Sequence, residues 1–296
     1  MKIALSLFDG MSCGQLALQR AGVSVDYYLA SEVETKAIEI TMSNFPGTIQ
    51  IGDVRELDGS AIVNPHILMG GSPCQCFSFA GKRKGMATTE GEEITTLDRY
   101  LELKKDGFEF EGQSYLFWEY VRILRETKPK YFLLENVMMA EKWAWVISDI
   151  LGVKPIRINS TLVSAQKRDR LYWTNIPGVE LPKDKGVQLQ DILENGYSEK
   201  SKSWCMLNSW NRFPKKMDSV KKRYARSMMP VVFSSPDFDW SQGWRPLNRS
   251  EGERLQTVPE NYTRVVSEKD ALGILGNGWT VDVIAHILSH IPEEEK

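Results

Sequence analysis

The chain has 296 residues, of which 42% are hydrophobic and 26% are charged. This is the composition of an ordinary globular protein, so it excludes a disordered chain, a collagen-like chain and a small disulfide scaffold. Lysine and arginine number 37 against 39 for aspartate and glutamate, which gives a formal net charge of −2. A nucleic-acid-binding surface must therefore be a local basic patch, because the whole molecule carries no excess of positive charge.

The cysteines and the amino-terminal segment indicate the cellular setting. The four cysteines are Cys13, Cys74, Cys76 and Cys205. They are too few for a disulfide framework and lack the paired spacing of a zinc site, so we expect a reducing, cytoplasmic setting and no bound metal. The first apolar stretch is too short for a signal peptide, and no apolar run approaches the length of a membrane span. We therefore expect a soluble protein that is not exported.

Short apolar runs alternate with helix-length amphipathic segments over the first 178 residues. This alternation predicts an α/β fold, with a mostly parallel sheet and helices on both of its faces. In such sheets, ligands bind beyond the carboxyl ends of the strands. The predicted strands cover residues 3–8, 27–30, 48–51, 67–69, 131–134 and 155–162.

Polar or glycine-rich segments directly follow five of the predicted strands. Because parallel strands end at the same edge of a sheet, we expect these segments to surround one site. They are Phe8-Asp9-Gly10, Glu32, Asp53, Gly71-Ser72-Pro73-Cys74 and Glu135-Asn136-Val137.

Residues 87–112 interrupt the alternation with a segment rich in acidic side chains. They hold eight aspartates and glutamates against three basic residues. Ile94, Leu97 and Leu101 recur at helical spacing, and Gly107 is a typical helix stop. The segment is therefore predicted to be an inserted acidic helical excursion.

Residues 179–244 also lose the strand–helix alternation and are predicted to form a separate small lobe. Within them, residues 201–226 carry eight basic side chains against Asp218 alone, interleaved with aromatic residues. Such a stretch suits contacts to phosphates and to bases, with a solvated basic face as the alternative. From residue 245 onward the helical pattern returns.

The turn after the first predicted strand has features of a nucleotide-binding loop. Gly10 and Gly14 let the backbone approach a ligand closely, and the next segment presents a helix N-terminus. Glu32 comes about twenty residues later, where an acid binds ribose hydroxyls in dinucleotide-binding folds. The loop lacks a full GxGxxG pattern, so a structural turn beside a surface acid is the alternative.

Cys74 is the candidate nucleophile. It follows Pro73 just past a predicted strand, in a loop that continues to Gly85, which favours presentation of the thiol to a substrate. A buried structural thiol is the alternative. Glu135 follows a neighbouring strand, so a thiol and a carboxyl group can converge on one small ring.

These motifs resemble, in their order, those of the cytosine-C5 DNA methyltransferases, most of all the de novo-type enzymes and their phage or bacterial relatives. The matches span the chain from residue 3 to about 290. They comprise the cofactor loop Phe8-Asp9-Gly10, the nucleophile motif Pro73-Cys74-Gln75, the acid motif Glu135-Asn136-Val137, the basic motif at residues 166–170, the segment 245–256 that supports the recognition lobe, and the cofactor-side motif Gly276-Asn277-Gly278-Trp279.

The resemblance implies a Rossmann-like fold that binds S-adenosylmethionine. Residues 1–178 would form the catalytic and cofactor-binding domain, residues 179–244 the target-recognition lobe, and residues 245–296 a segment that returns to the catalytic domain. The implied cofactor-binding residues are Phe8, Asp9, Gly10, Glu32, Val33, Asp53, Val54, Pro73, Leu116, Asn277, Gly278 and Trp279.

The implied reaction is methylation of a DNA cytosine at C5. Cys74 adds to C6 of the base, Glu135 hydrogen-bonds its N3 and N4 edge, and C5 takes the methyl group of S-adenosylmethionine. Arg168 and Arg170 orient the base and the Cys74 region. Since C6 is stacked inside a duplex, the target cytosine is flipped into the pocket of the enzyme.

The expected contacts to double-stranded DNA lie in the loop after Cys74, in the basic lobe and in the segment behind it. Phosphates repel acidic side chains, so we expect residues 87–112 to point away from DNA or to contact a partner, a second copy of the chain included. The expected DNA-binding residues are Gln75, Ser78, Lys82, Arg83, Lys84, Trp204, Trp210, Arg212, Lys215, Lys216, Lys221, Lys222, Arg223 and Arg254.

Two alternative functions fit the same residues. A tRNA-directed branch of the same family also carries Pro-Cys-Gln, so an RNA cytosine methyltransferase differs only in its substrate. A catalytically silent DNA-binding paralogue is the other alternative, and the intact Cys74, Glu135 and Arg170 argue against it.

Overall fold

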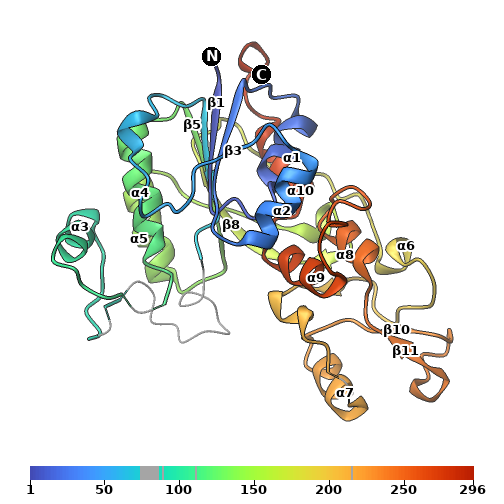
Figure 1. Ribbon diagram of the computed structural model, residues 1–296. Helices are drawn as coiled ribbons and strands as arrows, with labels where there is room; N and C mark the ends of the chain where they lie inside the picture. Colours follow the sequence, from blue (N-terminus) through green and yellow to red (C-terminus); the bar gives the residue numbers. More distant parts are fainter. Residues whose placement is uncertain (74–86, 89, 111, 215) are drawn as a thin grey trace.

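A seven-stranded sheet runs through the centre of the protein, in the order β3-β2-β1-β4-β5-β8-β6 (Figure 1). The computed structural model describes residues 1–73, 87–88, 90–110, 112–214 and 216–296. Neighbouring strands pair in parallel except at β8, which is antiparallel to both β5 and β6, so the prediction of a mostly parallel sheet is confirmed. The strands are β1 (Ile3–Leu7), β2 (Tyr27–Ser31), β3 (Ile49–Gln50), β4 (Ile67–Gly70), β5 (Tyr131–Val137), β6 (Ile156–Asn159) and β8 (Asp169–Thr174).

Helices cover both faces of this sheet, as the alternation of strands and helices predicts. Successive side chains of a strand point to opposite faces, so Ala4 of β1 packs into one hydrophobic core and Leu5 into the other. Full burial of a side chain such as Leu5 stabilises the fold by roughly 1.5–3 kcal/mol. One face is covered by α1 (Cys13–Ala21), α2 (Thr35–Asn44) and α10 (Val281–Leu288), and the other by α4 (Leu116–Thr127) and α5 (Glu141–Leu151) (Figure 1).

Two predicted strand boundaries differ from the structure by three residues, and the others by one residue at most. The strand predicted at residues 155–162 covers only Ile156–Asn159, because the Asn159 side chain accepts the N–H of Thr161 at 3.1 Å and starts the 3₁₀ turn Ser160–Leu162. The strand predicted to end at residue 134 continues to residue 137, so Glu135 lies inside β5. The cause is β8, a strand that the sequence prediction missed, which pairs with β5 along this stretch.

The acidic segment 87–112 contains a helix, α3 (Leu97–Lys105), that packs on the protein's own surface beside α4. The helix begins after Thr96, whose side chain accepts the N–H of Arg99 at 3.3 Å, so Ile94 precedes the helix that was expected to include it. The Tyr100 hydroxyl donates to Glu119 of α4 at 2.5 Å. The side chains that bury the apolar side of α3 are Leu97, Tyr100 and Leu103.

The lobe predicted at residues 179–244 has a small core of its own, formed by Val220, Val231 and Phe233, and it lies beside α8 and α9 (Figure 1). It is also joined to the main body, because β9 (Ser203–Trp204) pairs in parallel with β7 (Gln166–Lys167). Its remaining elements are α6 (Leu189–Ile192), the 3₁₀ turn Asn208–Asn211, α7 (Met217–Ala225), β10 (Val232–Phe233), the 3₁₀ turn Trp240–Gln242 and β11 (Trp244–Arg245). Helices α8 (Arg249–Leu255) and α9 (Glu268–Asn277) follow, and 3₁₀ turns also lie at Gly59–Ala61 and Glu293–Glu295.

Helices α9 and α10 form an apolar stretch that is longer than any apolar run expected from the sequence. The 21 residues Glu268–Leu288 are long and apolar enough, by length and composition, to cross a membrane. Of their most apolar window, however, 72% is buried inside the fold. We therefore describe these residues as buried core helices, of which α10 covers the sheet.

Candidate active site

Glu135 and Arg170 form a buried ion pair between neighbouring strands. In the β5–β8 ladder Glu135 pairs with Tyr172 and Val137 pairs with Arg170. Arg170 is therefore the diagonal neighbour of Glu135 on the same face of the sheet, within reach of a long side chain. Arg170 Nε donates to Glu135 Oε1 at 2.8 Å, and the two side chains are only 12% and 10% exposed. The structure thus brings together two of the four residues predicted to be catalytic.

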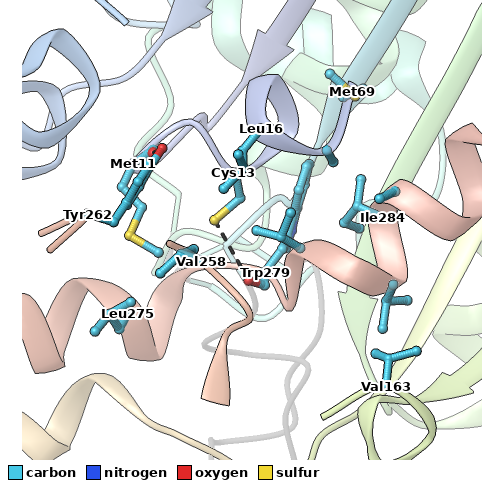
Figure 2. Packing of buried hydrophobic residues seen from close by; sticks show 14 of the residues in the cluster. Met11, Cys13, Leu16, Met69, Val163, Val258, Tyr262, Leu275, Trp279 and Ile284 are labelled. Atoms are coloured by element: carbon cyan, nitrogen blue, oxygen red, sulfur yellow. Dashed lines mark hydrogen bonds between the residues drawn. The ribbon is translucent and has the colours of Figure 1, made fainter. Parts of the chain in front are cut away.

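Trp279 holds the second oxygen of the same carboxylate. Its indole Nε1–H donates to Glu135 Oε2 at 3.2 Å, although the sequence pointed to Trp279 only as a cofactor contact. Figure 2 shows Trp279 in the core near Cys13 and Ile284, and the Cys13 thiol approaches the Trp279 carbonyl oxygen at 3.7 Å. Because the indole is anchored in this core, it fixes the direction in which Glu135 points.

Gly71, the first residue after β4, leaves room for this pair. A Cβ atom at Gly71 would lie 2.9 Å from Trp279 Nε1, which real Cβ atoms essentially never do, and 3.0 Å from Glu135 Oε2, which is tighter than most real Cβ contacts. The next residue is tied to β5, since the Asn136 side chain donates to Ser72 Oγ at 3.1 Å. The end of β4, from which the chain continues through Pro73 to Cys74, therefore lies against the Glu135 carboxylate, as the rule on parallel strand ends predicts.

The turn after β1 has an unusual backbone. Phe8 and Gly10 adopt left-handed conformations, with φ of 56° and 61°, and for a bulky residue such strain is typical of ligand-binding turns. Glu32 Oε2 accepts the N–H of Gly10 at 2.7 Å, and Oε1 accepts those of Val33 and Glu34 at 2.7 and 2.8 Å. A carboxylate has about four lone-pair sites, so Glu32 keeps capacity for a hydroxyl donor. Val33 is 66% exposed beside it. The Glu32 carboxylate, as an acceptor, and the apolar Val33 side chain together fit the ribose and the base of a nucleoside cofactor.

Asp9 is a buried residue of this loop. It is 8% exposed, its Oδ1 accepts the Tyr28 hydroxyl at 2.6 Å, and its Oδ2 accepts the hydroxyl of Ser12. Burial raises the pKa of Asp9 to about 6, against the opposing effect of these hydrogen bonds. The Asp9 side chain therefore holds the loop from inside, and a contact between Asp9 and the cofactor stays a prediction.

The remaining cofactor candidates lie in varied surroundings. Asp53 pairs with Arg55 across a distance of 2.5 Å, and the Arg55 hydrogen bond lowers the pKa of Asp53. Val54 is buried among apolar side chains, so its side chain is not accessible to a ligand. Of the others, Pro73, Leu116 and Gly278 are half-buried and Asn277 is exposed.

Arg168 is buried where three parts of the chain meet. It is 4% exposed, and its guanidinium donates to the carbonyl oxygens of Met206, Gly276 and Gly278 at 3.2, 3.3 and 2.9 Å. These carbonyls belong to the lobe segment and to the segment that carries Trp279. The buried guanidinium of Arg168 thus joins three parts of the chain, and its role in orienting the base and the Cys74 region stays a prediction.

Gln166 and Gln256 extend this junction. Gln166 Nε2 donates to Gln256 Oε1 at 2.8 Å, and Gln256 Nε2 donates to the Gly278 carbonyl at 3.1 Å. The basic motif, the lobe-supporting motif and the cofactor-side motif, far apart in sequence, therefore meet through buried hydrogen bonds. A buried side-chain amide of Gln166 or Gln256 without a partner would destabilise the fold. Each of the three motifs therefore supplies hydrogen-bond partners that the others need.

Four of the basic residues expected to contact DNA are exposed on the lobe, while Trp204 and Arg223 are half-buried. Lys221 of α7 lies 5.4 Å from the ring centroid of Trp240, and Trp204 packs edge-on against Tyr224 with ring centroids 5.4 Å apart. Basic charge and aromatic rings thus share one surface. The four expected DNA contacts that are exposed are Arg212, Lys216, Lys221 and Lys222.

Two other expected DNA contacts are used internally. Trp210 is 6% exposed and donates its indole N–H to the Met228 carbonyl at 3.0 Å, so it is a core residue, which contradicts the prediction. Arg254 donates to the Ile192 carbonyl at 2.9 Å and forms an ion pair with Glu260, so its charge is already neutralised. Sequence charge alone did not reveal either partner.

Several candidates lie outside the described residues. The structure gives no position for Cys74, Gln75, Ser78, Lys82, Arg83, Lys84 or Lys215.

The chain is similar to several known proteins. A family model for the C-5 cytosine-specific DNA methylase matches residues 3–105 and 103–142. The orphan methyltransferase M.SPRI of Bacillus phage SPR is 33% identical over 271 residues, covering 87% of this chain and 51% of that protein. The type II methyltransferase M.NgoBV of Neisseria gonorrhoeae is 27% identical over 223 residues, covering 67% of this chain and 47% of that protein. The chain therefore spans about half the length of these curated relatives.

The fold is also that of a solved structure. A DNMT2 variant from Spodoptera frugiperda superposes with a TM-score of 0.66 at 20% identity, covering 98% of this chain and 99% of that one. At this identity the likeness shows the fold, and the family follows from the sequence matches and from the order of the motifs that the structure brings together. The chain belongs to the C-5 cytosine-specific DNA methylase family.

Proposed function

We propose that this protein is a DNA cytosine-C5 methyltransferase that uses S-adenosylmethionine. The observation that carries the proposal is the Glu135 carboxylate, held by Arg170 at 2.8 Å and by Trp279 at 3.2 Å. It lies against the end of β4, from which the chain leads directly to Cys74. A nucleophilic thiol and an oriented carboxyl group are what activation of a cytosine ring requires.

In the proposed reaction, the Cys74 thiolate adds to C6 of a flipped cytosine and raises the electron density at C5. Glu135 hydrogen-bonds the N3 and N4 edge of the ring, which stabilises the charge that builds up there. Bound S-adenosylmethionine supplies the methyl group. Loss of the C5 proton then restores the aromatic ring and expels Cys74. Arg170 contributes by holding Glu135 in place while this happens.

The proposed cofactor site is the turn after β1 together with Glu32 and Val33. Glu32 would accept a ribose hydroxyl at its remaining lone pair, and the exposed Val33 side chain would pack on the adenine. Asp9 acts behind the turn, since its hydrogen bonds to Tyr28 and Ser12 hold the loop backbone.

The proposed substrate is double-stranded DNA, bound by residues 179–244 as a target-recognition lobe. Its exposed cations, Lys216, Lys221 and Lys222 among them, can neutralise phosphates, which position the duplex without reading its sequence. The bacterial and phage origins of the relatives support a cytoplasmic enzyme of a bacterial host or of a phage-infected cell.

The decisive experiment is nucleoside mass spectrometry. Purified protein is incubated with S-adenosylmethionine and either unmodified duplex DNA or tRNA, beside the Cys74→Ala variant. We expect 5-methylcytosine in DNA with the wild type and none with the variant, which should still bind DNA and cofactor. Product in tRNA alone would favour the RNA enzyme, and product in neither substrate would favour a silent paralogue.

A further inference from the structure

Cys205 lies beside both arginines of the candidate site, although no sequence motif predicted a role for it. Its sulfur is 3.5 Å from Arg168 Nη1 and 3.6 Å from Arg170 Nη2, both within hydrogen-bonding distance for sulfur. Arg170 in turn holds Glu135. A chain of contacts therefore runs from Cys205 through Arg170 to the carboxylate of the proposed reaction.

The pairing of two short strands explains this position. Lys167 of β7 pairs in parallel with Trp204 of β9, so the residues that follow, Arg168 and Cys205, also lie next to each other. The partners are 37 residues apart in sequence. Cys205 is half-buried, and it stands where the lobe joins the catalytic sheet.

The charges in this cluster do not balance without the cysteine. The groups that face one another are the guanidiniums of Arg168 and Arg170, the carboxylate of Glu135, the thiol of Cys205 and the buried Tyr172 phenol. Among the residues that the structure describes, two positive charges thus meet one negative charge in a region that is largely removed from water. Buried charges are costly unless they are paired, and a thiolate would supply the missing negative charge.

The electrostatic surroundings of Cys205 also favour the thiolate form. Burial by itself raises the pKa of this thiol, but the two guanidiniums outweigh it and hold the pKa below its ordinary value. Among the described residues the protonated thiol donates to the Met206 carbonyl, at 3.5 Å, whereas the thiolate accepts from both arginines. For comparison, Cys13 lies in an apolar core, and burial raises its pKa to about 12.

We propose that Cys205 is a positioning residue that acts as a thiolate, sharing its charge between Arg168 and Arg170 so that Arg170 stays aligned on Glu135. This inference rests on the proposed methyl transfer only for its effect on turnover. It makes the junction between the recognition lobe and the catalytic sheet part of the machinery that orients Glu135.

The first test measures ionisation and requires no substrate. In the full-length Cys74→Ser/Cys76→Ser protein, the ultraviolet absorbance of thiolate is titrated against pH and compared with the same protein carrying Cys205→Ser. We expect a titration assigned to Cys205 below the ordinary thiol pKa of about 8.5. A titration at or above that value would overturn the proposal, whether or not the enzyme methylates DNA.

The second test uses two variants of nearly equal size that differ in charge. Cys205→Asp keeps a negative charge between the arginines, and Cys205→Asn does not. We expect Cys205→Asn to lower kcat about tenfold, a typical coupling within one ion-pair network, with KM for DNA unchanged. Cys205→Asp should retain most of kcat and shift the acid limb of the pH profile to lower pH. Equal losses, or no loss, in the two variants would overturn the proposal.

The two tests separate the failure of one proposal from that of the other. A wild type that methylates neither DNA nor tRNA would refute the proposed function, while the thiolate titration would still decide the charge state of Cys205. An active wild type with an ordinary Cys205 pKa would refute only this inference.

Discussion

Arg170 Nε and Glu135 Oε1 lie 2.8 Å apart because they occupy diagonal positions on two antiparallel strands. The remaining oxygen of the carboxylate accepts the Trp279 indole at 3.2 Å. A side chain held at both oxygens in a dry environment has little freedom to rotate. Such pre-orientation lowers the reorganisation needed when charge develops on a substrate.

Arg170→Lys should damage turnover more than stability. Lysine keeps the positive charge but loses the planar fork of donors that holds Glu135 and Cys205 together. We expect kcat to fall by up to about 100-fold, the cost of a misplacement of about 1 Å. The control is Arg157→Lys, since Arg157 of β6 pairs with Asp169 of β8, the strand that also carries Arg170, but is 65% exposed. Equal activities in the two variants would rule out an orienting role for Arg170.

Trp279→Phe removes one hydrogen bond and keeps an aromatic ring in the core. A hydrogen bond to a charged group contributes about 1.5–3 kcal/mol to stability, so we expect the free energy of unfolding to fall by up to that amount, and kcat to fall by roughly ten- to a hundredfold because Glu135 loses its orientation. Trp145→Phe is the matched control, because Trp145 is 66% exposed on α5. The role assigned to the indole N–H would be wrong if the Trp279 variant kept full kcat.

Gly71→Ala should disturb the site through a single methyl group. The added Cβ would meet Trp279 Nε1 at 2.9 Å and Glu135 Oε2 at 3.0 Å, so one of the two side chains must move. We expect methylation to be lost or strongly reduced while DNA binding persists, measured by gel shift beside the activity assay. Gly47→Ala serves as the control, because a Cβ there meets nothing within 4 Å.

Asp9 should make stability fall as pH rises through the mildly acidic range. Its pKa is raised from 3.8 to about 6 in the folded protein, so between these values the folded state binds more protons than the unfolded state. The stabilisation by the protonated form is complete below pH 3.8 and is lost by about pH 6, a difference of about 3 kcal/mol.

Urea unfolding of the wild type and of Asp9→Asn at a series of pH values checks this linkage. The variant cannot titrate, so the difference in unfolding free energy between the two proteins should change by about that amount between pH 4 and pH 7 and stay constant above. A constant difference throughout would show that Asp9 keeps an ordinary pKa in the fold.

The basic surface of the lobe should show itself in the salt dependence of DNA binding. Each neutralised phosphate contributes a slope of about −0.9 to the dependence of log K on log salt, so the double change Lys221→Ala and Lys222→Ala should reduce the slope by about 2. Lys154→Ala is the control, since Lys154 is exposed at the amino end of β6, away from the carboxyl edge of the strands. An unchanged slope in the double variant would show that DNA binds at another surface of the protein.

The sequence by itself determined the parallel strands and the turns that follow them. The apolar runs of β1, β2 and β4 are local signals, and parallel strands end together, so the meeting of Gly71 with Glu135 could be predicted without coordinates. The turn after β1 and Glu32 at the end of β2 were placed for the same reason. In each case the deciding information lay within about ten residues of the chain, because local periodicity specifies strands and turns.

Only the tertiary structure decided the partners. Strand β8 forms because it is held between β5 and β6, and this pairing puts Arg170 beside Glu135. The Trp279 bond to Glu135 joins residues 144 positions apart, and the β7–β9 pair brings Cys205 to Arg168. Trp210 and Arg254 have the residue types of a DNA-binding surface, yet burial and an ion pair employ them internally. Composition records which groups a chain has, whereas burial and long-range pairing determine which of them remain available to a ligand.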